Sequence, residues 1–398
     1  MVTPRTRLAS HRFLMLALAV GGLIGGTRVV VEATDTDDAP GSSALVSNAG
    51  ASPSHDPGTP MPHRAPVHRS RPLNVYASTE HRMSPAVAGD PERIYVPNSE
   101  SGSVDVIDPA TFRIVSHFSV GSYPEHITPS WNLRWLYVDN TYGNALTVVD
   151  PRTGRPTGRT IPVTDPYNLY FTPDGSKAIV VAERNRRLDF RDPRTWRLIK
   201  SVPIPAAGPD HLDFSAGGRF LLVSAEFGGD VFRVSTTSMR VTGSLHVGGA
   251  PIDVRLSPDG SVFYVANQGL DGVSLIDGRA LRRVAFIPTG AGAHGLAVSR
   301  DARFLYVSNR LAGSISEVAF ASRRVVATWH VGGSPDMMQV SPDGRELWVS
   351  NRFDGTVSVI DTRTGHLIHV IPVGSSPHGL AFFPQPGRYS LGHNGVYR

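Results

Sequence analysis

Histidines and carboxylates recur at one spot along a chain that otherwise shows few patterns associated with catalysis. Each follows a corner rich in glycine or proline, and the corners are 42 or 43 residues apart. The histidines are His126, His211, His294 and His378, and the carboxylates are Glu125, Asp210, Asp253 and Asp336. Imidazole and carboxylate together suit a divalent metal ion or a general acid/base pair. We take these corners as candidate ligand-binding positions, with Arg310 and Arg352 expected behind them.

A less specific interpretation of the same corners stays open. Polar side chains there could line a water-filled channel mouth, each serving only its local turn. We therefore predict no cofactor and no catalytic residue, although a divalent metal ion would suit the set.

Familiar catalytic motifs are missing from the sequence. It has no G-x-S-x-G elbow, no H-E-x-x-H and no G-x-x-x-x-G-K phosphate loop. Residues 290–295, GAGAHG, match G-x-G-x-x-G, but a dinucleotide site needs a helix after the glycines. The residues that follow, GLAVS, continue as a strand, so this match is a corner between strands.

The elements that must position the corner residues belong to a repeat. The first strand of the repeat starts near residues 94, 136, 179, 221, 263, 305 and 347, as in IYVPN, LYVDN and LWVSN. Each copy continues with two more alternating strands, a corner and a fourth apolar run that often closes with S-P-D-G. Four strands in about 42 residues is typical of a β-propeller blade. The sequence therefore predicts an all-β fold, a seven-bladed β-propeller of four-stranded antiparallel blades.

Ring closure leaves two candidates for the inner strand of the first blade. Residues 84–90 precede the first copy, and residues 377–384, PHGLAFFP, follow the last. We favour the second, because it matches the repeat better, which would latch the ring with strands from both ends. The tail, residues 387–398, is then expected on the outside or along one face.

Recurrent asparagines and aspartates are also possible ligands, but they recur at the turns of successive blades. Short polar side chains there bond to neighbouring backbone and stabilise turns, so we assign them a structural role. They are Asn98, Asn140, Asn267, Asn309, Asn351, Asp108, Asp150, Asp192, Asp277 and Asp361.

Composition excludes several classes of function. The net charge is +5, but the basic residues are spread along the chain without a basic, aromatic-lined run, so no nucleic-acid partner is expected. The chain has no cysteine, which excludes disulfides, thiolate metal sites and a cysteine nucleophile.

The N-terminal region has the composition of an export signal followed by a tether. Arginines precede the apolar run FLMLALAVGGLIGG, which is too short to span a bilayer comfortably. We predict a signal peptide over residues 1–33, a disordered tether rich in Pro, Ser, Gly and Asp over 34–75, and the propeller over 76–398. The mature protein would be secreted, periplasmic or on the cell surface, without a transmembrane span. An uncleaved membrane anchor is the alternative.

The recurring Y-V-x-N, S-P-D-G and V-I-D-x-x-T-G elements resemble the YVTN-repeat β-propeller family, the YncE-like exported proteins. That resemblance implies a scaffold and no single reaction. We expect a non-catalytic propeller that binds a partner protein, a small ligand or a metal ion at one mouth of its axial channel. The alternatives are a lactonase-like or other hydrolase with a His/carboxylate or metal site at that mouth, and a structural protein of the envelope or surface.

Overall fold

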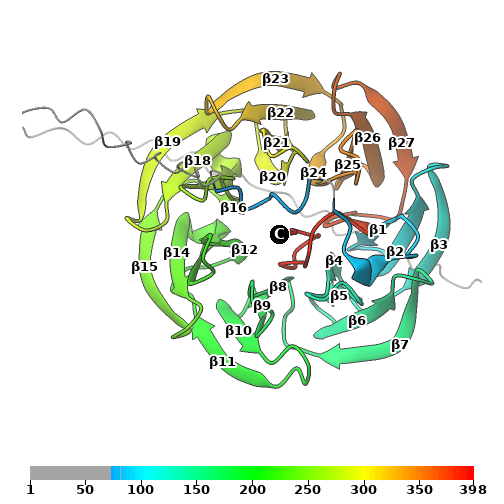
Figure 1. The fold of residues 1–398 in the computed structure, drawn as a ribbon, viewed down its shortest axis with the longest axis horizontal. Helices are drawn as coiled ribbons and strands as arrows, with labels where there is room; N and C mark the ends of the chain where they lie inside the picture. Colours follow the sequence, from blue (N-terminus) through cyan, green and yellow to red (C-terminus); the bar gives the residue numbers. More distant parts are fainter. Residues whose placement is uncertain (1–72, 81) are drawn as a thin grey trace, which may run out of the picture. The chain divides into compact units, whose positions relative to one another are not determined.

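The computed structural model describes residues 73–80 and 82–398, which form a ring of seven four-stranded antiparallel sheets around a central axis (Figure 1). The predicted seven-bladed, all-β fold is thus confirmed. The predicted signal peptide and residues 34–72 of the predicted tether lie outside the described residues. Among the described residues, no helix is long and apolar enough to span a membrane.

The strands of each blade are named in order from the axis outward, so the first strand named is the innermost. The first blade contains β28 (Ala381–Phe383), β1 (Arg93–Asn98), β2 (Ser103–Asp108) and β3 (Arg113–Ser119). The second contains β4 (Pro124–Pro129), β5 (Leu136–Asn140), β6 (Ala145–Asp150) and β7 (Arg155–Pro162). The third contains β8 (Asn168–Phe171), β9 (Ala178–Ala182), β10 (Arg187–Arg191) and β11 (Leu198–Pro203).

The remaining blades follow the same order. The fourth contains β12 (Pro209–Phe214), β13 (Phe220–Ala225), β14 (Asp230–Ser235) and β15 (Arg240–His246). The fifth contains β16 (Pro251–Leu256), β17 (Phe263–Asn267), β18 (Gly272–Asp277) and β19 (Arg282–Pro288). The sixth contains β20 (Ala293–Val298), β21 (Phe304–Asn309), β22 (Ser314–Ala319) and β23 (Arg324–His330). The seventh contains β24 (Pro335–Val340), β25 (Glu346–Asn351), β26 (Thr356–Asp361) and β27 (Leu367–Pro372). Three short 3-10 helices, η1 (Pro85–Val87), η2 (Glu226–Gly228) and η3 (Gln268–Leu270), complete the elements of the described part of the chain.

Packing between neighbouring blades provides the core. Trp348 of β25 is fully buried against Ile94 and Phe382 of the first blade, which joins the two ends of the ring. The outermost strands, such as β3, are largely exposed. The blades therefore hold each other along their broad sides, as the alternation of apolar residues predicts.

The ring is closed by β28, as predicted. It pairs antiparallel with β1, with Ile94 opposite Phe382. The competing candidate, residues 84–90, forms η1 instead of a strand. Closure of this kind removes the exposed sheet edges that a linear stack would leave.

The repeated asparagines and aspartates form hydrogen bonds that stabilise the turns in which they lie. Asn140 donates to the Thr147 hydroxyl at 2.9 Å and accepts from the Gly121 amide at 3.0 Å. Asp361 accepts from the backbone amide of Thr364 at 2.8 Å. The structural role predicted for these side chains agrees with these bonds.

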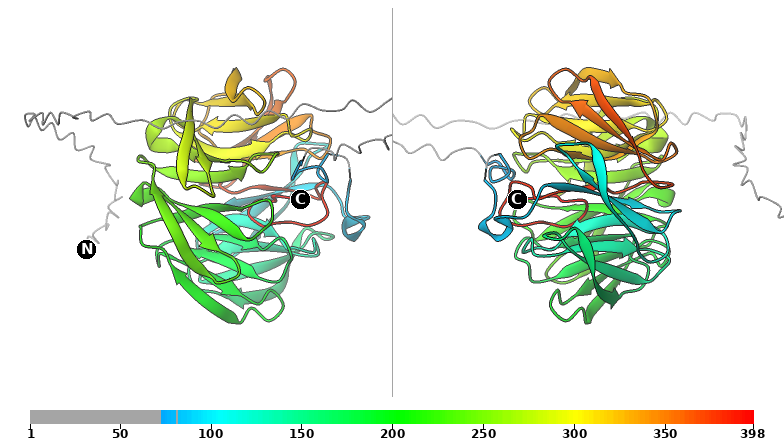
Figure 2. Two further views of the ribbon diagram at one scale, coloured as in Figure 1. Left: turned by 60° about the vertical axis from the view of Figure 1, so that its left-hand side comes forward. Right: turned by 90° about the vertical axis from the view of Figure 1, so that its right-hand side faces the viewer.

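The ring has two faces, which the loops distinguish. Face A carries the corners before the inner strands and the loops that contain Arg310 and Arg352. Face B carries the S-P-D-G turns, such as the one at Asp343. Residues 73–80 and 82–90 lie on face B, where the Val75 amide donates to the Pro258 oxygen (Figure 2).

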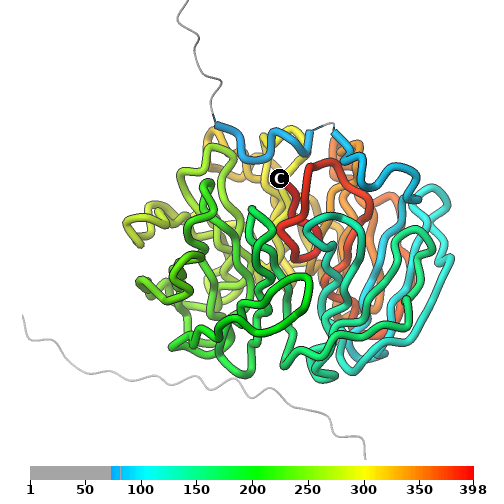
Figure 3. Tube along the Cα trace, turned by 60° about the horizontal axis from the view of Figure 1, so that its bottom comes forward, coloured from blue at the N-terminus to red at the C-terminus, as the bar shows by residue number. Residues whose placement is uncertain are grey.

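The position of the C-terminal tail differs from the prediction. Residues 387–398 were expected on the outside or along one face, but they enter the central channel from face B (Figures 1 and 3). They form a β-hairpin in which Leu391 bonds to Val396 and Tyr389 pairs with Arg398. We call residues 387–398 the plug hairpin. Nothing in the repeat register signals this insertion, because the hairpin lies beyond the last repeat.

Candidate functional site

A bulge at the start of the inner strands brings the corner residues to the axis. In blade four, Pro209 lies opposite Ala225 and Leu212 lies opposite Val223, so β12 contains one residue more than β13 over this stretch. The extra residue disturbs the in-out alternation of side chains. As a result Asp210 and His211, although adjacent in sequence, are both buried beside the channel axis. Blades five, six and seven carry the same irregularity.

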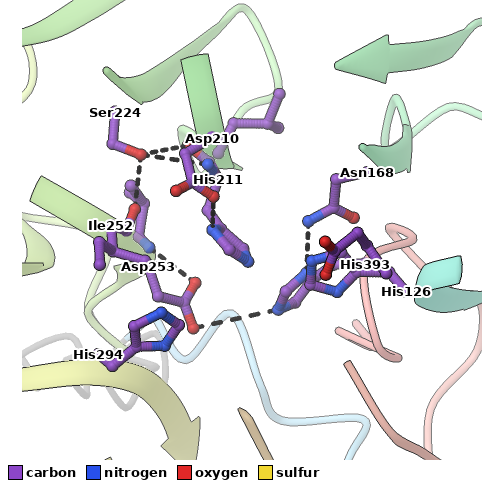
Figure 4. A network of polar contacts seen from close by, with 12 residues as sticks. His126, Asn168, Asp210, His211, Ser224, Ile252, Asp253, His294 and His393 are labelled. Carbon is purple, nitrogen blue, oxygen red and sulfur yellow. Dashed lines mark hydrogen bonds and ion pairs between the residues drawn. The ribbon is translucent and has the colours of Figure 1, made fainter. Parts of the chain in front are cut away.

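Three histidines from different elements meet at the centre (Figure 4). His126 comes from β4, His211 from β12 and His393 from the tip of the plug hairpin, and none has exposed surface. Their ring centroids are 5.2, 5.2 and 4.7 Å apart. One nitrogen of each ring lies within 4.8 Å of the other two. Among the described residues, the Nε2 atoms of all three lack a hydrogen-bond partner.

The other nitrogen of each ring, Nδ1, contacts a polar neighbour. Nδ1 of His126 donates to the Asn394 side-chain oxygen at 2.7 Å, which leaves a lone pair on its Nε2. The Asp210 carboxylate lies against Nδ1 of His211. The Asn168 amide nitrogen is 2.9 Å from Nδ1 of His393. Neighbours of this kind fix the orientation of metal-binding imidazoles.

Burial keeps these imidazoles neutral. It lowers the pKa of His211 and of His294 to about 3, and lowers those of His126 and His393 well below their ordinary values. Beside burial, the nearby His378 lowers the pKa of His126, and the nearby Arg255 lowers that of His393. A neutral imidazole is the form that binds metal ions.

The plug hairpin supplies His393 and Asn394, and the conformation of its backbone positions both side chains. The His393 amide bonds to Leu169 at 2.7 Å, and His393 adopts a φ of 52°, which is uncommon for a residue with a side chain. At Gly392, φ is 94° and an added Cβ would lie 2.4 Å from the Leu169 oxygen. Only glycine permits this approach to β8. Sequence reasoning missed His393 because it lies outside the repeat, although the G-H-N-G turn was a visible hairpin signal.

A second group of side chains closes the cluster toward face A. Asp336 is 2.8 Å from Nδ1 of both His294 and His378, and 2.5 Å from Arg310. Arg352 contacts both Glu125 oxygens, at 3.0 and 3.3 Å. The side chains of Arg310 and Arg352 are only 12% and 15% exposed. They therefore cover the histidines from this side.

The charges within this group hold Asp336 ionised. Burial alone would raise its pKa, but the Arg310 guanidinium, together with the His294 and His378 rings that contact the carboxylate, keeps the pKa well below its ordinary value. The pKa of Glu125 is lowered for a similar reason, by Arg352 and then His378 against burial.

Carboxyl groups gather on the opposite side of the channel. Burial raises the pKa of Asp210 to about 7. Burial and the Asp210 charge raise the pKa of Glu226 to about 8 and that of Glu183 to about 9. Glu226 was not among the predicted site residues. The repeat could have found it, because it precedes Arg310 by two repeat lengths and occupies the same loop position.

The structure brings all the predicted site residues into the channel. His126 and His211 belong to the three-histidine cluster, while His294, His378, Glu125, Asp336, Arg310 and Arg352 form the group above it. Asp253 is chiefly engaged by Arg255, at 2.7 Å, and lies 4.0 Å from Nε2 of His393. The set is not an open mouth as expected, because its histidines and carboxylates are at most 4% exposed.

Fold and site together define a seven-bladed propeller with a histidine and carboxylate cluster enclosed in its axial channel. Its sequence matches the model of the YncE-like β-propeller family over residues 75–386, and the chain belongs to that family. None of the curated proteins matches the chain.

Solved structures share the fold at low sequence identity. A functionally unknown protein from Desulfotomaculum acetoxidans is 16% identical, with a TM-score of 0.63 over 73% of this chain and 98% of its own. A Bacteroides fragilis protein, provisionally assigned as a 6-phosphogluconolactonase, is 17% identical, with a TM-score of 0.61 over 74% and 99%. Hydrazine synthase from Kuenenia stuttgartiensis is 20% identical, with a TM-score of 0.56 over 64% and 87%. At these identities the likeness concerns the fold alone.

Proposed function

We propose that this protein is an exported, non-catalytic propeller that binds one divalent transition-metal ion in its axial channel. The ligands are His126, His211 and His393. The observation that carries the proposal is that three buried imidazoles each place one nitrogen within 4.8 Å of the other two, while their Nε2 atoms have no hydrogen-bond partner among the described residues. A buried polar group left unpaired costs about 1–3 kcal/mol, so three at one point favour a ligand.

The geometry is close to that of a three-histidine metal site. A tetrahedral ion with bonds of about 2.0–2.1 Å separates its nitrogen ligands by roughly 3.4 Å. From separations of up to 4.8 Å, each ring would need to move inward by about 1 Å or less. Imidazole ligands suit zinc, copper, nickel and cobalt better than calcium or magnesium.

One neighbour must adjust when an ion binds. Binding through Nε2 of His393 requires the ring proton on Nδ1, where the Asn168 amide now donates. A half-turn of that amide presents its oxygen to Nδ1 instead. His126 needs no such change, because Asn394 already accepts its Nδ1 proton.

Export is supported by the composition of the first 33 residues. Imidazole ligands keep their affinity in an oxidising compartment, where thiolates would be lost.

Binding is favoured over hydrolysis because Arg310 and Arg352 cover the cluster. A hydrolase of the lactonase type would need room for a substrate beside the ion. It would also show metal-dependent turnover that is lost in His211→Ala.

The test is metal analysis of the purified full chain after stripping with chelator and dialysis against zinc, copper, nickel or cobalt. We expect one ion per chain for at least one of these metals, and a loss of more than ten-fold in affinity for His126→Ala, His211→Ala and His393→Ala. The matched controls are His117→Ala and His246→Ala, whose side chains are 59% and 71% exposed. The proposal fails if the wild type binds none of these ions, or if the controls lose as much affinity as the cluster variants.

A further inference from the structure

A separate cavity lies between the plug hairpin and the inner strands of the sixth and seventh blades, β20 and β24. Its volume is about 50 Å³, enough for a few small atoms and too little for a sugar or nucleotide. It is lined by Tyr76, Arg255, Arg300, Gln339 and Tyr397, together with apolar residues of blades six and seven. None of the three histidines proposed to bind metal lines it.

Positive charge in this region is only partly balanced. Arg255 pairs with Asp253 at 2.7 Å, and Arg398 pairs with Asp213 at 2.8 Å. Among the described residues, no carboxylate lies within ion-pair distance of Arg300. The guanidinium group instead donates to the backbone oxygens of Ser341, at 2.9 Å, and Val340, at 2.5 Å, and to the side chain of Gln385.

Two groups at the cavity have hydrogen-bonding capacity left over. A guanidinium group has five N–H donors, and Nη1 of Arg300 makes no hydrogen bond to the described residues. The Tyr397 hydroxyl is buried without a partner among them. Desolvation lowers the pKa of Arg300 to about 10, against smaller opposing effects of Tyr397 and Asp343. Arg300 is only partly exposed, so solvent screens its charge incompletely.

We infer that this cavity is a binding site for a small monovalent anion, either a short carboxylate or a halide. A negative charge there would pair with Arg300 and accept a hydrogen bond from Tyr397. Water could fill the volume, but it would leave the charge of Arg300 unbalanced. Because the plug hairpin supplies Tyr397, an anion bound here would also help to hold the hairpin in the channel.

The test is thermal unfolding of the full chain in sodium acetate, chloride or gluconate at equal ionic strength. Gluconate carries the same charge as acetate but is too large for the cavity. We expect a saturable rise in Tm with acetate, with chloride, or with both, and none with gluconate. The ion that raises Tm shows whether the site binds a short carboxylate or a halide. A crystal soaked in bromide would place a halide by its anomalous signal.

Variants separate this site from a general salt effect. Tyr397→Phe should weaken the apparent anion affinity about ten-fold with little other change, and Arg300→Met should abolish the response. Arg345→Met is the control, since its side chain is 85% exposed on face B. Equal responses to acetate, chloride and gluconate, or an unchanged response in Tyr397→Phe and Arg300→Met, would overturn the inference. The metal proposal would be unaffected, because metal content is measured separately.

Discussion

His126 and Asn394 are 268 positions apart in the chain and are joined by a buried hydrogen bond of 2.7 Å. The bond links an inner strand of the second blade to the tip of the plug hairpin. It places a proton on Nδ1 of His126 and so leaves the lone pair of this ring on Nε2. The plug hairpin therefore contributes one proposed metal ligand, His393, and orients another.

Removal of that orienting group should weaken metal binding without unfolding the ring. Asn394→Ala leaves Nδ1 of His126 without its acceptor, and loss of such a partner typically costs about 10–100-fold in metal affinity. Competition against a coloured chelator would measure the affinity, and circular dichroism would verify the fold. Asn144→Ala, at an exposed loop position, is the control. An affinity equal to that of the wild type would show that the bond has no orienting role.

Docking of the plug hairpin should depend on the absence of a side chain at position 392. Gly392→Ala brings a Cβ against Leu169 and Tyr170, in addition to the unfavourable φ of 94°. We expect a loss of about 2 kcal/mol or more in the free energy of unfolding, measured in urea, and faster tryptic cleavage after Arg388.

Gly158→Ala separates the two causes. Its φ is 80°, but an added Cβ there would meet nothing within 4 Å. A loss in Gly392→Ala no larger than in Gly158→Ala would mean that backbone strain alone, and not the approach to β8, is responsible.

The Asp336 carboxylate should be important for stability as well as for the cover over the histidines. Asp336→Asn removes the charge that pairs with Arg310, which is only 12% exposed and would be left buried without its partner. Breaking a buried ion pair in this way typically costs roughly 3–5 kcal/mol. Chemical denaturation would measure it. Asp343→Asn, with a side chain 58% exposed, should cost far less; comparable losses would argue against a buried network.

The carboxyl group of Glu183 predicts a stability that falls as the pH rises. Burial, then the charges of Asp210 and Glu226, raises its pKa from the ordinary 4.5 to about 9. Between these values the folded state holds a proton that the unfolded state has released, so this contribution is present at low pH and is lost as the pH rises toward 9. The slope is at most about 1.4 kcal/mol per pH unit for one group.

Glu183→Gln keeps the shape of the protonated acid and should reduce the loss of stability between pH 6 and pH 9. Urea denaturation at several pH values in chelator would measure it without interference from metal ions. Glu100→Gln, at an exposed position of the same face, should leave the pH profile as in the wild type. A profile in Glu183→Gln as steep as that of the wild type would assign the pH dependence to other groups.

Much of the fold could be predicted from the sequence, because each blade of a propeller is encoded by a copy of the same sequence repeat. The period fixed the number of blades, and the better match of residues 377–384 identified β28 as the closing strand. The repeat register also placed His126, His211, His294 and His378 at equivalent corners. Local hydrogen bonding and alternating burial decide these features, and both are visible within each copy.

Tertiary structure alone decided what the corners enclose. The bulge that brings Asp210 and His211 to the axis is not signalled by residue type, since it depends on the pairing of β12 with β13. The insertion of the plug hairpin depends on contacts between residues hundreds of positions apart, which no local pattern records. It converts an expected open mouth into an enclosed cluster and adds His393 to it. The sequence determined the ring, and long-range packing determined its centre.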